Sequence, residues 1–327
     1  MEILAGIHQL KVPIPDNPLG YLNSYLLQGT DGWLMIDTGW NVDYAFESLK
    51  QQLKDIDLSL EQITQIVITH MHFDHYGLTR RIKAVSSATV AYHRIEKETL
   101  EAMMQSEKQI WDQGREMMLS NGVPPSKPGE ARPAHLAAAR DSMVWPDRVL
   151  EDGDQLSTGI FNLTVMLTPG HSRGHICLYE PENKLLFSGD HILPIITPNI
   201  SFNLFSGPDP LTDFTQSLAY VNDRDVKKVF PAHEHIFDDL PARVQDILVH
   251  HDNRNAVIRN TIDDGPLTAY EIASRIPWDV PDTTWETMLT IDKRSATLET
   301  LAHLEYMKGE GKVTSSTDNG LIRYQQV

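Results

Sequence analysis

The pattern of apolar and polar positions predicts strands mixed with helices in the first part of the chain. Apolar segments at residues 21–27 and 33–36 flank Gly29-Thr30-Asp31-Gly32, which is typical of a hairpin turn. Helical spacing over residues 43–53 predicts a helix, and the β-branched run at 63–69 predicts a buried strand. A further helix is predicted at 78–85, and further strands at 89–92, 161–167, 176–179, 185–187 and 229–230.

The pattern changes between about residues 94 and 145. Residues 96–120 are rich in Met, Glu, Gln and Leu and predict a long helix, and residues 134–143 predict another. One interpretation is a helical insertion that covers hydrophobic surface. The other is a lid or a wall of a substrate pocket, with side chains from Met103, Met104, Trp111 and Met118. The sequence does not separate the two.

After Pro241 the sequence is mainly helical, with helices predicted at 243–261, 268–275 and 295–308. Residues 312–325 predict a hairpin around Asp318-Asn319-Gly320. We therefore expect a catalytic domain over residues 1–240 and a small winged-helix-like domain over 241–327. This segment holds nine Lys or Arg and thirteen Asp or Glu, a balance of 9 − 13 = −4, whereas a DNA-reading helix needs a basic face. Packing on the catalytic domain, or dimerisation, is the favoured role.

Composition narrows the class of protein. The 327 residues carry 28 − 45 = −17 charges, and a surface this acidic repels phosphate backbones, which makes nucleic acid an improbable partner. The single cysteine, Cys177, cannot form an internal disulfide. No apolar run has the length of a membrane span, and the first residues lack the pattern of a signal peptide. We expect a cytoplasmic protein without a membrane partner that acts on a small molecule and could form a homodimer.

The segment Thr69-His70-Met71-His72-Phe73-Asp74-His75 carries the candidate chemistry. It directly follows the strand predicted at 63–69, and side chains two positions apart at a strand end point the same way. His70 and His72 could therefore reach one ion, and Asp74 and His75 a second ion beside it. Imidazole nitrogen and carboxylate oxygen are ligands of Zn²⁺ and related ions. Packing explains this segment poorly, because burying so many polar groups is costly without partners.

Three further candidate ligands stand at predicted strand ends. His171 follows the strand at 161–167, Asp190 follows the strand at 185–187, and His233 follows the strand at 229–230. Functional loops commonly gather at one edge of a sheet, so the four strand ends could converge there. This recurrence is the strongest sequence evidence for a metal site.

In this order, His70, His72, Asp74, His75, His171, Asp190 and His233 resemble the metal motif of the metallo-β-lactamase superfamily, in the form found in glyoxalase II. The resemblance covers roughly residues 6–240 and implies an α/β (α+β) protein with an αββα sandwich. It implies that His70, His72 and His171 hold the first metal. Asp74, His75 and His233 would hold the second, with Asp190 bridging. The two divalent ions would be Zn²⁺, with Fe or Mn as alternatives.

Two further segments carry the resemblance. The turn Ile36-Asp37-Thr38-Gly39 matches the family, and there Asp37 would orient a ligand histidine, although an ordinary turn aspartate fits nearly as well. The tail resembles the winged-helix extension of hydrolases related to a mitochondrial endoribonuclease. His175 and Ser172 could support the loop around His171, and His191 and His235 could support ligands or carry protons. Tyr76 could hold a substrate oxyanion or be an ordinary exposed aromatic.

A serine hydrolase is the rival interpretation. Gly170-His171-Ser172-Arg173-Gly174 matches the G-x-S-x-G pattern that would make Ser172 a nucleophile, and a predicted strand precedes it. The motif is short enough to recur by chance, and a serine hydrolase leaves the histidine cluster unexplained. The metal interpretation is therefore favoured.

The resemblance implies a dinuclear metal-dependent hydrolase in which a metal-bridging hydroxide attacks a small ester or thioester. Asp190 would fix the separation of the metals, and Asp74 would help to orient the nucleophile, so both count as catalytic. Two alternatives remain. A metal-dependent ribonuclease is suggested by the tail, and a mononuclear-iron persulfide dioxygenase keeps the same histidines. Diiron oxidoreductases of the superfamily typically have Glu where this chain has His72, which favours hydrolysis.

Overall fold

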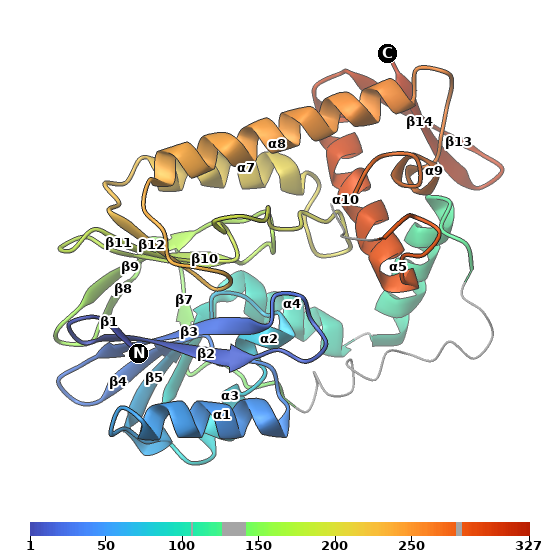
Figure 1. Cartoon of the computed structure of the whole chain (residues 1–327). Coiled ribbons are helices and arrows are strands. Elements are labelled where there is room, and N and C mark those ends of the chain that lie inside the picture. The colour runs from blue at the N-terminus through green and yellow to red at the C-terminus, as the bar shows by residue number, and fades with distance from the viewer. Residues whose placement is uncertain (106, 126–141, 279–282) are drawn as a thin grey trace.

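Two stacked β-sheets form the centre of the computed structural model, which describes residues 1–105, 107–125, 142–278 and 283–327 (Figure 1). The first sheet has the order β1(Glu2–Leu4)–β2(Ile7–Pro13)–β3(Tyr21–Gln28)–β4(Trp33–Ile36)–β5(Ile63–Val67)–β6(Thr89–His93)–β7(Arg148–Leu150). The second sheet has the order β12(Lys228–Pro231)–β11(Leu185–Gly189)–β10(Ile176–Glu180)–β9(Asn162–Leu167)–β8(Gln155–Ser157). The predicted hairpin is confirmed, since β3 and β4 pair antiparallel with Gln28 opposite Trp33.

Apolar side chains explain why the sheets stack and why helices cover them. The inner faces share a buried cluster that includes Tyr25, Val67, Val165 and Phe187. On the outer face of the first sheet lie α1 (Asp43–Lys54) and α3 (Thr79–Lys83), and on that of the second lie α7 (Pro210–Asn222) and α8 (Leu240–Thr261) (Figure 1). These layers confirm the expected αββα sandwich.

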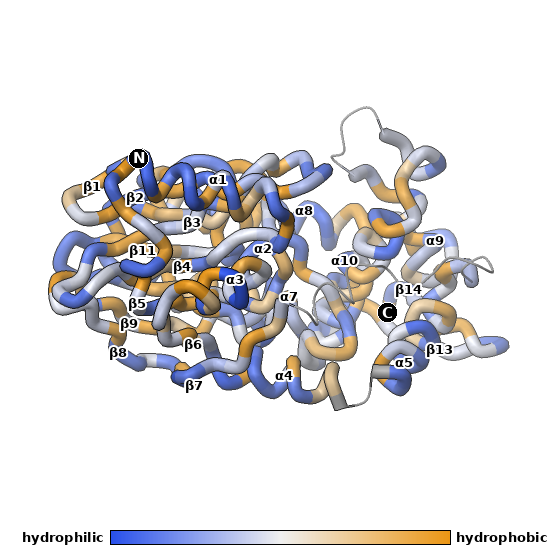
Figure 2. The backbone as a smooth tube through the Cα atoms, turned by 90° about the horizontal axis from the view of Figure 1, so that it is seen from below, coloured by the Kyte–Doolittle hydropathy of each residue, from blue (hydrophilic) through white to orange (hydrophobic). Residues whose placement is uncertain are grey.

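The C-terminal segment lies at one end of the sandwich, as Figure 2 shows from below. It contains α9 (Ala269–Ala273), α10 (Thr290–Gly309) and the antiparallel pair β13 (Val313–Asp318) and β14 (Leu321–Gln326), as the helix and hairpin pattern predicted. Its own apolar cluster includes Ile272, Leu304 and Tyr324. The helix α8 contributes side chains to this cluster and to the cluster on the outer face of the second sheet, with Ile258 in the first and Val244 in the second. The division at residue 240 and the winged-helix assignment stay predictions.

The residues predicted as helical at 96–120 lie in α4 (Arg94–Gln105) and α5 (Glu107–Ser120). Residue 106, between them, lies outside the described residues. The predicted helix at 134–143 lies outside the described residues except for its last two positions. Met103, Met104 and Trp111 are 40 %, 42 % and 39 % exposed, so their side chains border solvent.

Smaller differences concern element ends. The strand predicted at 63–69 ends at Val67, and a one-turn helix, α2 (Phe73–Tyr76), precedes α3. The short 3₁₀ helix Leu60–Gln62 leads into β5. The helix α7 was not predicted, although Asp209 accepts a hydrogen bond from the Thr212 amide at its first turn, 3.0 Å away. Within the described ranges, no helix combines the length and the apolar character needed to cross a bilayer.

Candidate metal centre

All the predicted ligands lie at carboxyl ends of strands along one edge of the sandwich. His70 and His72 follow β5, and Asp74 and His75 belong to α2. In the second sheet β9, β11 and β12 run in the same direction, because β10 is antiparallel to β9 and β11 while β12 is parallel to β11. Their carboxyl ends therefore meet at one edge, which brings together His171, Asp190 and His233.

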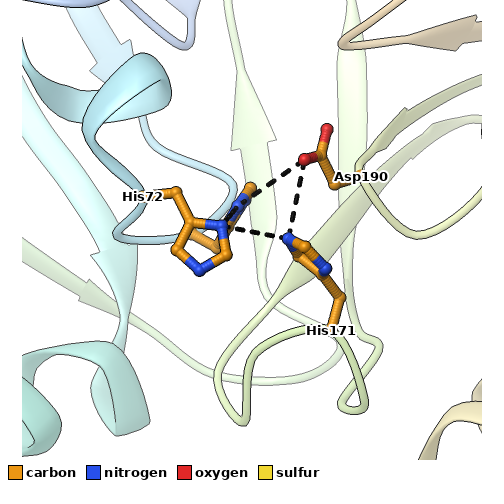
Figure 3. Close-up of side chains that lie close together, drawn as sticks. His72, His171 and Asp190 are labelled. Atoms are coloured by element: carbon orange, nitrogen blue, oxygen red, sulfur yellow. Dashed lines mark hydrogen bonds and ion pairs between the residues drawn. The ribbon is translucent and has the colours of Figure 1, made fainter. Parts of the chain in front are cut away.

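The first group consists of His70, His72, His171 and Asp190. His72 Nδ1 lies 2.8 Å from His70 Nε2 and 3.0 Å from His171 Nε2. Figure 3 shows the rings of His72 and His171 pointing toward one another, with the Asp190 carboxylate closing the group. Asp190 Oδ2 is 3.5 Å from His171 Nε2 and 4.0 Å from His70 Nε2. Three imidazole nitrogens with lone pairs directed at one point repel unless a cation lies between them.

The second group consists of Asp74, His75 and His233, and Asp190 lies beside it. His233 Nε2 is 3.4 Å from Asp74 Oδ2 and 3.4 Å from Asp190 Oδ1. His75 Nε2 is 3.8 Å from Asp74 Oδ2 and 3.4 Å from Asp190 Oδ2. Asp190 Oδ2 therefore lies between the two groups, within 3.5 Å of both His171 and His75.

These distances fit metal binding. Four ligands about 2.05 Å from a tetrahedral Zn²⁺ lie about 3.3 Å from one another. The distances within the two groups, from 2.8 to 4.0 Å, bracket this value. Among the described residues, no hydrogen bond reaches His75 Nε2, His233 Nε2 or Asp190 Oδ1, although all three atoms are buried. Buried polar atoms without hydrogen bonds are costly, so a cation at this position would satisfy them.

The outer ring nitrogens of four histidines are held by hydrogen bonds, which directs their Nε2 atoms inward. His171 Nδ1 donates to the Asn199 carbonyl over 2.9 Å, and His233 Nδ1 donates to the Tyr21 carbonyl over 3.2 Å. His70 Nδ1 lies 3.1 Å from the hydroxyl of Thr69, and His75 Nδ1 is held by Asp37. Such partners fix the tautomer and the orientation that a metal ligand needs.

Asp37 has the orienting role that the family resemblance suggested for it. Its Oδ2 accepts from His75 Nδ1 over 2.8 Å and from the Thr69 hydroxyl over 2.8 Å, while Oδ1 accepts from the Thr69 amide over 2.8 Å. The backbone of Asp37 is left-handed, with φ +56°, a conformation that Asp and Asn tolerate better than most residues. The Asp37 carboxylate thus joins β4 to the start of the ligand loop.

Glu96 supports the site from α4, and no pattern in the sequence pointed to it. Its side chain is buried, and Oε1 accepts from the Ser172 hydroxyl over 2.7 Å and from the Gly174 amide over 3.0 Å. Oε2 accepts from the Met71 amide over 3.3 Å. Burial raises the pKa of Glu96, while these three hydrogen bonds oppose the rise. One carboxyl group thus connects the loop of His70 and His72 to the loop of His171.

The other residues that the sequence suggested as candidates lie outside the two ligand groups. Ser172 donates to Glu96, which supports the loop, as expected, and gives the serine hydrolase interpretation no support. His175 Nδ1 is 2.8 Å from the Thr168 hydroxyl, and its Nε2 accepts from the Asp190 amide over 3.1 Å, so it holds the bridging aspartate. His191 is buried, and burial lowers its pKa to about 3. His235 is exposed, and Tyr76 is buried in the apolar cluster of the first sheet.

The two groups differ in charge. Burial and neighbouring histidines lower the pKa of His70 and His72, the latter to about 3, so both are neutral at pH 7, as metal ligands must be. Burial also lowers the pKa of His171. In the second group burial opposes the charged form, but Asp190 and Asp74 raise the pKa of His233 to about 10. An ion bound there would replace protons that otherwise balance the two carboxylates.

Comparisons with known proteins agree with this geometry. Residues 17–233 match the metallo-beta-lactamase superfamily. A probable metallo-hydrolase of Bacillus subtilis, YqjP, is 25 % identical over 97 % of this chain and 96 % of its own length. The acyl-coenzyme A thioesterase MBLAC2 of Gallus gallus is 33 % identical over 66 % of this chain and 73 % of its own length.

A solved structure extends the likeness to the whole chain. A metallo-beta-lactamase family protein of Thermus thermophilus is 28 % identical, with a TM-score of 0.85 and complete coverage of both chains. The family match reaches from before β3 to His233, so it includes every predicted ligand. The chain is therefore a member of the metallo-beta-lactamase superfamily and a metal-dependent hydrolase, with two groups of His and Asp side chains suited to divalent metal ions.

Proposed function

We propose that the chain hydrolyses an acyl thioester at a centre of two divalent ions, with zinc as the expected metal. The observation that carries this proposal is the position of Asp190 Oδ2, within 3.5 Å of His171 in one ligand group and 3.4 Å of His75 in the other. A carboxylate between two ligand groups is what a pair of ions needs to remain at a fixed separation. A mononuclear iron centre would use one group and leave the other without a role.

The residues have separate tasks in the proposed reaction. His70, His72 and His171 would hold the first ion, Asp74, His75 and His233 the second, and Asp190 both. When bound, the ions would lower the pKa of water toward neutrality and polarise the carbonyl oxygen of the substrate. Burial and the charge of Asp190 act to raise the pKa of Asp74, but His75 and His233 outweigh them and lower it to about 2. Asp74 therefore stays ionised at neutral pH and can accept a hydrogen bond that orients the attacking water.

A rigid apolar loop beside the ligands supports an acyl substrate. The loop runs from Asp190 to Asn199, whose carbonyl holds His171. Glu234, next to His233, accepts from the amides of Ile195 and Ile196 over 2.9 and 3.3 Å. Arg243 donates to the carbonyls of both isoleucines over 2.9 and 2.8 Å.

This fixed backbone leaves Ile195 67 % exposed and Ile196 40 % exposed. Large apolar side chains held in solvent next to a reaction centre are typical of a binding surface. An acyl chain would bury them. The name of the Gallus gallus relative, an acyl-coenzyme A thioesterase, supports the same substrate class. The net charge of −17 disfavours the ribonuclease alternative.

The test is an assay of thiol release from acyl-coenzyme A thioesters of increasing chain length by protein loaded with zinc. We expect turnover, and we expect His72→Ala and Asp190→Ala to abolish it while circular dichroism shows the wild-type fold. Wild-type activity in either variant would refute the site. Metal content near one ion per chain, with oxygen-dependent turnover of a persulfide, would instead support the dioxygenase. A cytoplasmic location and a homodimer stay predictions.

A further inference from the structure

The helix α10 of the C-terminal segment reaches the ligand His171 through two hydrogen bonds in series. His171 Nδ1 donates to the backbone carbonyl of Asn199 over 2.9 Å. The side-chain amide of the same residue, Asn199 Nδ2, donates to Glu299 Oε2 over 2.7 Å. The ligand, the loop and the helix are thus connected without a gap, although 100 positions separate Asn199 from Glu299.

A second bond joins the same loop to the same helix. The amide of Phe202 donates to the carbonyl of Leu298, the neighbour of Glu299, over 3.0 Å. The Phe202 side chain also packs against two apolar clusters, that of the sandwich, which contains Leu218, and that of the C-terminal segment, which contains Leu304. The loop that holds His171 therefore follows the position of α10.

The Glu299 carboxylate lies in the field of a fixed positive charge. Arg254 of α8 attracts the carboxylate, which together with the bond from Asn199 opposes the rise in the pKa of Glu299 that burial causes. Arg254 is itself fixed, because its guanidinium donates to the Pro277 carbonyl over 2.6 Å and lies 4.5 Å from the centre of the Trp278 ring. An acceptor that lies in the field of a fixed positive charge is suited to position a donor.

The other described anchors of ligand histidines come from the sandwich. His233 is held by Tyr21 at the start of β3, His75 by Asp37 after β4, and His70 by its neighbour Thr69. His171 differs, because its anchor Asn199 is bonded to the C-terminal segment.

We propose that Glu299 is a positioning residue which, through Asn199, holds His171 in the orientation for metal binding, so that the C-terminal segment forms part of the support of the metal centre. This inference rests on the proposed metal site, but not on the identity of the substrate. It gives the C-terminal segment a role that neither DNA binding nor dimerisation requires.

The test measures metal binding rather than turnover. Full-length Glu299→Ala and Asn199→Ala variants are compared with wild type for zinc affinity, by competition with a chromophoric chelator, and for the visible spectrum of the Co²⁺-loaded protein. We expect each variant to bind the ion of the His171 group about tenfold more weakly, with a changed Co²⁺ spectrum. The double variant should lose no more than one single variant, because both act on the same bond. Glu299→Gln keeps an oxygen that can accept from Asn199 and should restore the affinity.

Glu305→Ala is the matched control on the same helix. Glu305 accepts from the hydroxyl of Tyr324 over 3.2 Å and from Lys308 over 2.9 Å, so its loss disturbs the C-terminal segment without touching Asn199. We expect its zinc affinity and Co²⁺ spectrum to equal those of wild type, even where its melting temperature falls. Wild-type affinity in Glu299→Ala and Asn199→Ala would overturn the proposal, and so would an equal loss in Glu305→Ala. Wild-type protein that binds no divalent ion would overturn the metal site itself, whereas failure to cleave thioesters would leave this inference intact.

Discussion

Replacement of Asp37 by Asn changes one proton position beneath the metal centre and almost nothing in shape. In wild type the Asp37 carboxylate accepts from His75 Nδ1 over 2.8 Å, which leaves Nε2, 3.4 Å from Asp190, as the ring nitrogen that can bind a metal. An Asn amide placed toward His75 donates to Nδ1 instead. The proton of the imidazole then moves to Nε2, and a protonated nitrogen cannot bind a metal.

The expected magnitude follows from the loss of one buried, charge-assisted hydrogen bond. Such outer partners typically contribute 10- to 100-fold to metal affinity, which corresponds to about 1.4 to 2.7 kcal/mol. Asn can still accept from the Thr69 amide through its remaining oxygen, and it tolerates the left-handed backbone of position 37. We therefore expect Asp37→Asn to fold and to bind the ion of the Asp74, His75 and His233 group 10- to 100-fold more weakly.

The assay is stepwise chelator competition, which resolves two binding events, with catalytic rate as a second readout. Asp57→Asn is the control, because Asp57 also has a left-handed backbone, with φ +57°, and is exposed. We expect the control to bind both ions like wild type. Unchanged affinity for both ions in Asp37→Asn would show that His75 does not depend on Asp37 for its tautomer, and the ligand assignment would fail.

Three further predictions concern other parts of the molecule. Ile195→Ser with Ile196→Ser should lower kcat/KM about tenfold for long acyl thioesters and leave acetyl thioesters nearly unchanged, because apolar contact is lost while Glu234 and Arg243 still bond the backbone; equal loss for both chain lengths would contradict an acyl surface. Ser172→Ala should keep its rate within about tenfold of wild type and lose about 1 kcal/mol of stability with the bond to Glu96, whereas a nucleophilic serine would lose at least about a thousandfold. Burial lowers the pKa of His251 to about 3. Between pH 6.5 and pH 3 this residue is therefore protonated in the unfolded chain but not in the folded chain. The free energy of unfolding that His251 contributes above pH 6.5 is lost as the pH falls toward 3. We measure the free energy of unfolding in urea at pH 7 and at pH 5. From pH 7 to pH 5 it should fall by about 2 kcal/mol less in His251→Leu than in wild type, and an equal fall in both proteins would refute this prediction.

Local patterns predicted much of the fold and the ligands. The strand ends that carry His171, Asp190 and His233 could be predicted because each strand is a short apolar run with its ligand within four residues of its end. The tip of the β3–β4 hairpin and the start of α1 were also placed correctly. These features depend on residues near in sequence, which is where periodicity and turn chemistry apply.

Supports that act over long sequence distances were not predicted. Glu96 stands in a helix rich in charged residues, where a glutamate ordinarily faces solvent, yet it accepts from Ser172, 76 positions away. Asn199 and Glu299 carried no motif at all, because their contact exists only once α10 lies against the loop. The helix α7 shows the opposite case, since Asp209-Pro210 is a helix-start signal that was present in the sequence and overlooked.

The two sheets each supply part of one ligand set, with His70, His72 and His75 from one and His171, Asp190 and His233 from the other. An occupied centre would thus act as a crosslink between loops as far apart as His72 and His171, which are separated by 99 positions. Joining such distant loops restricts the unfolded chain much as a covalent bridge does. We expect a cell starved of metal to degrade this protein faster, so that its abundance would follow the metal supply.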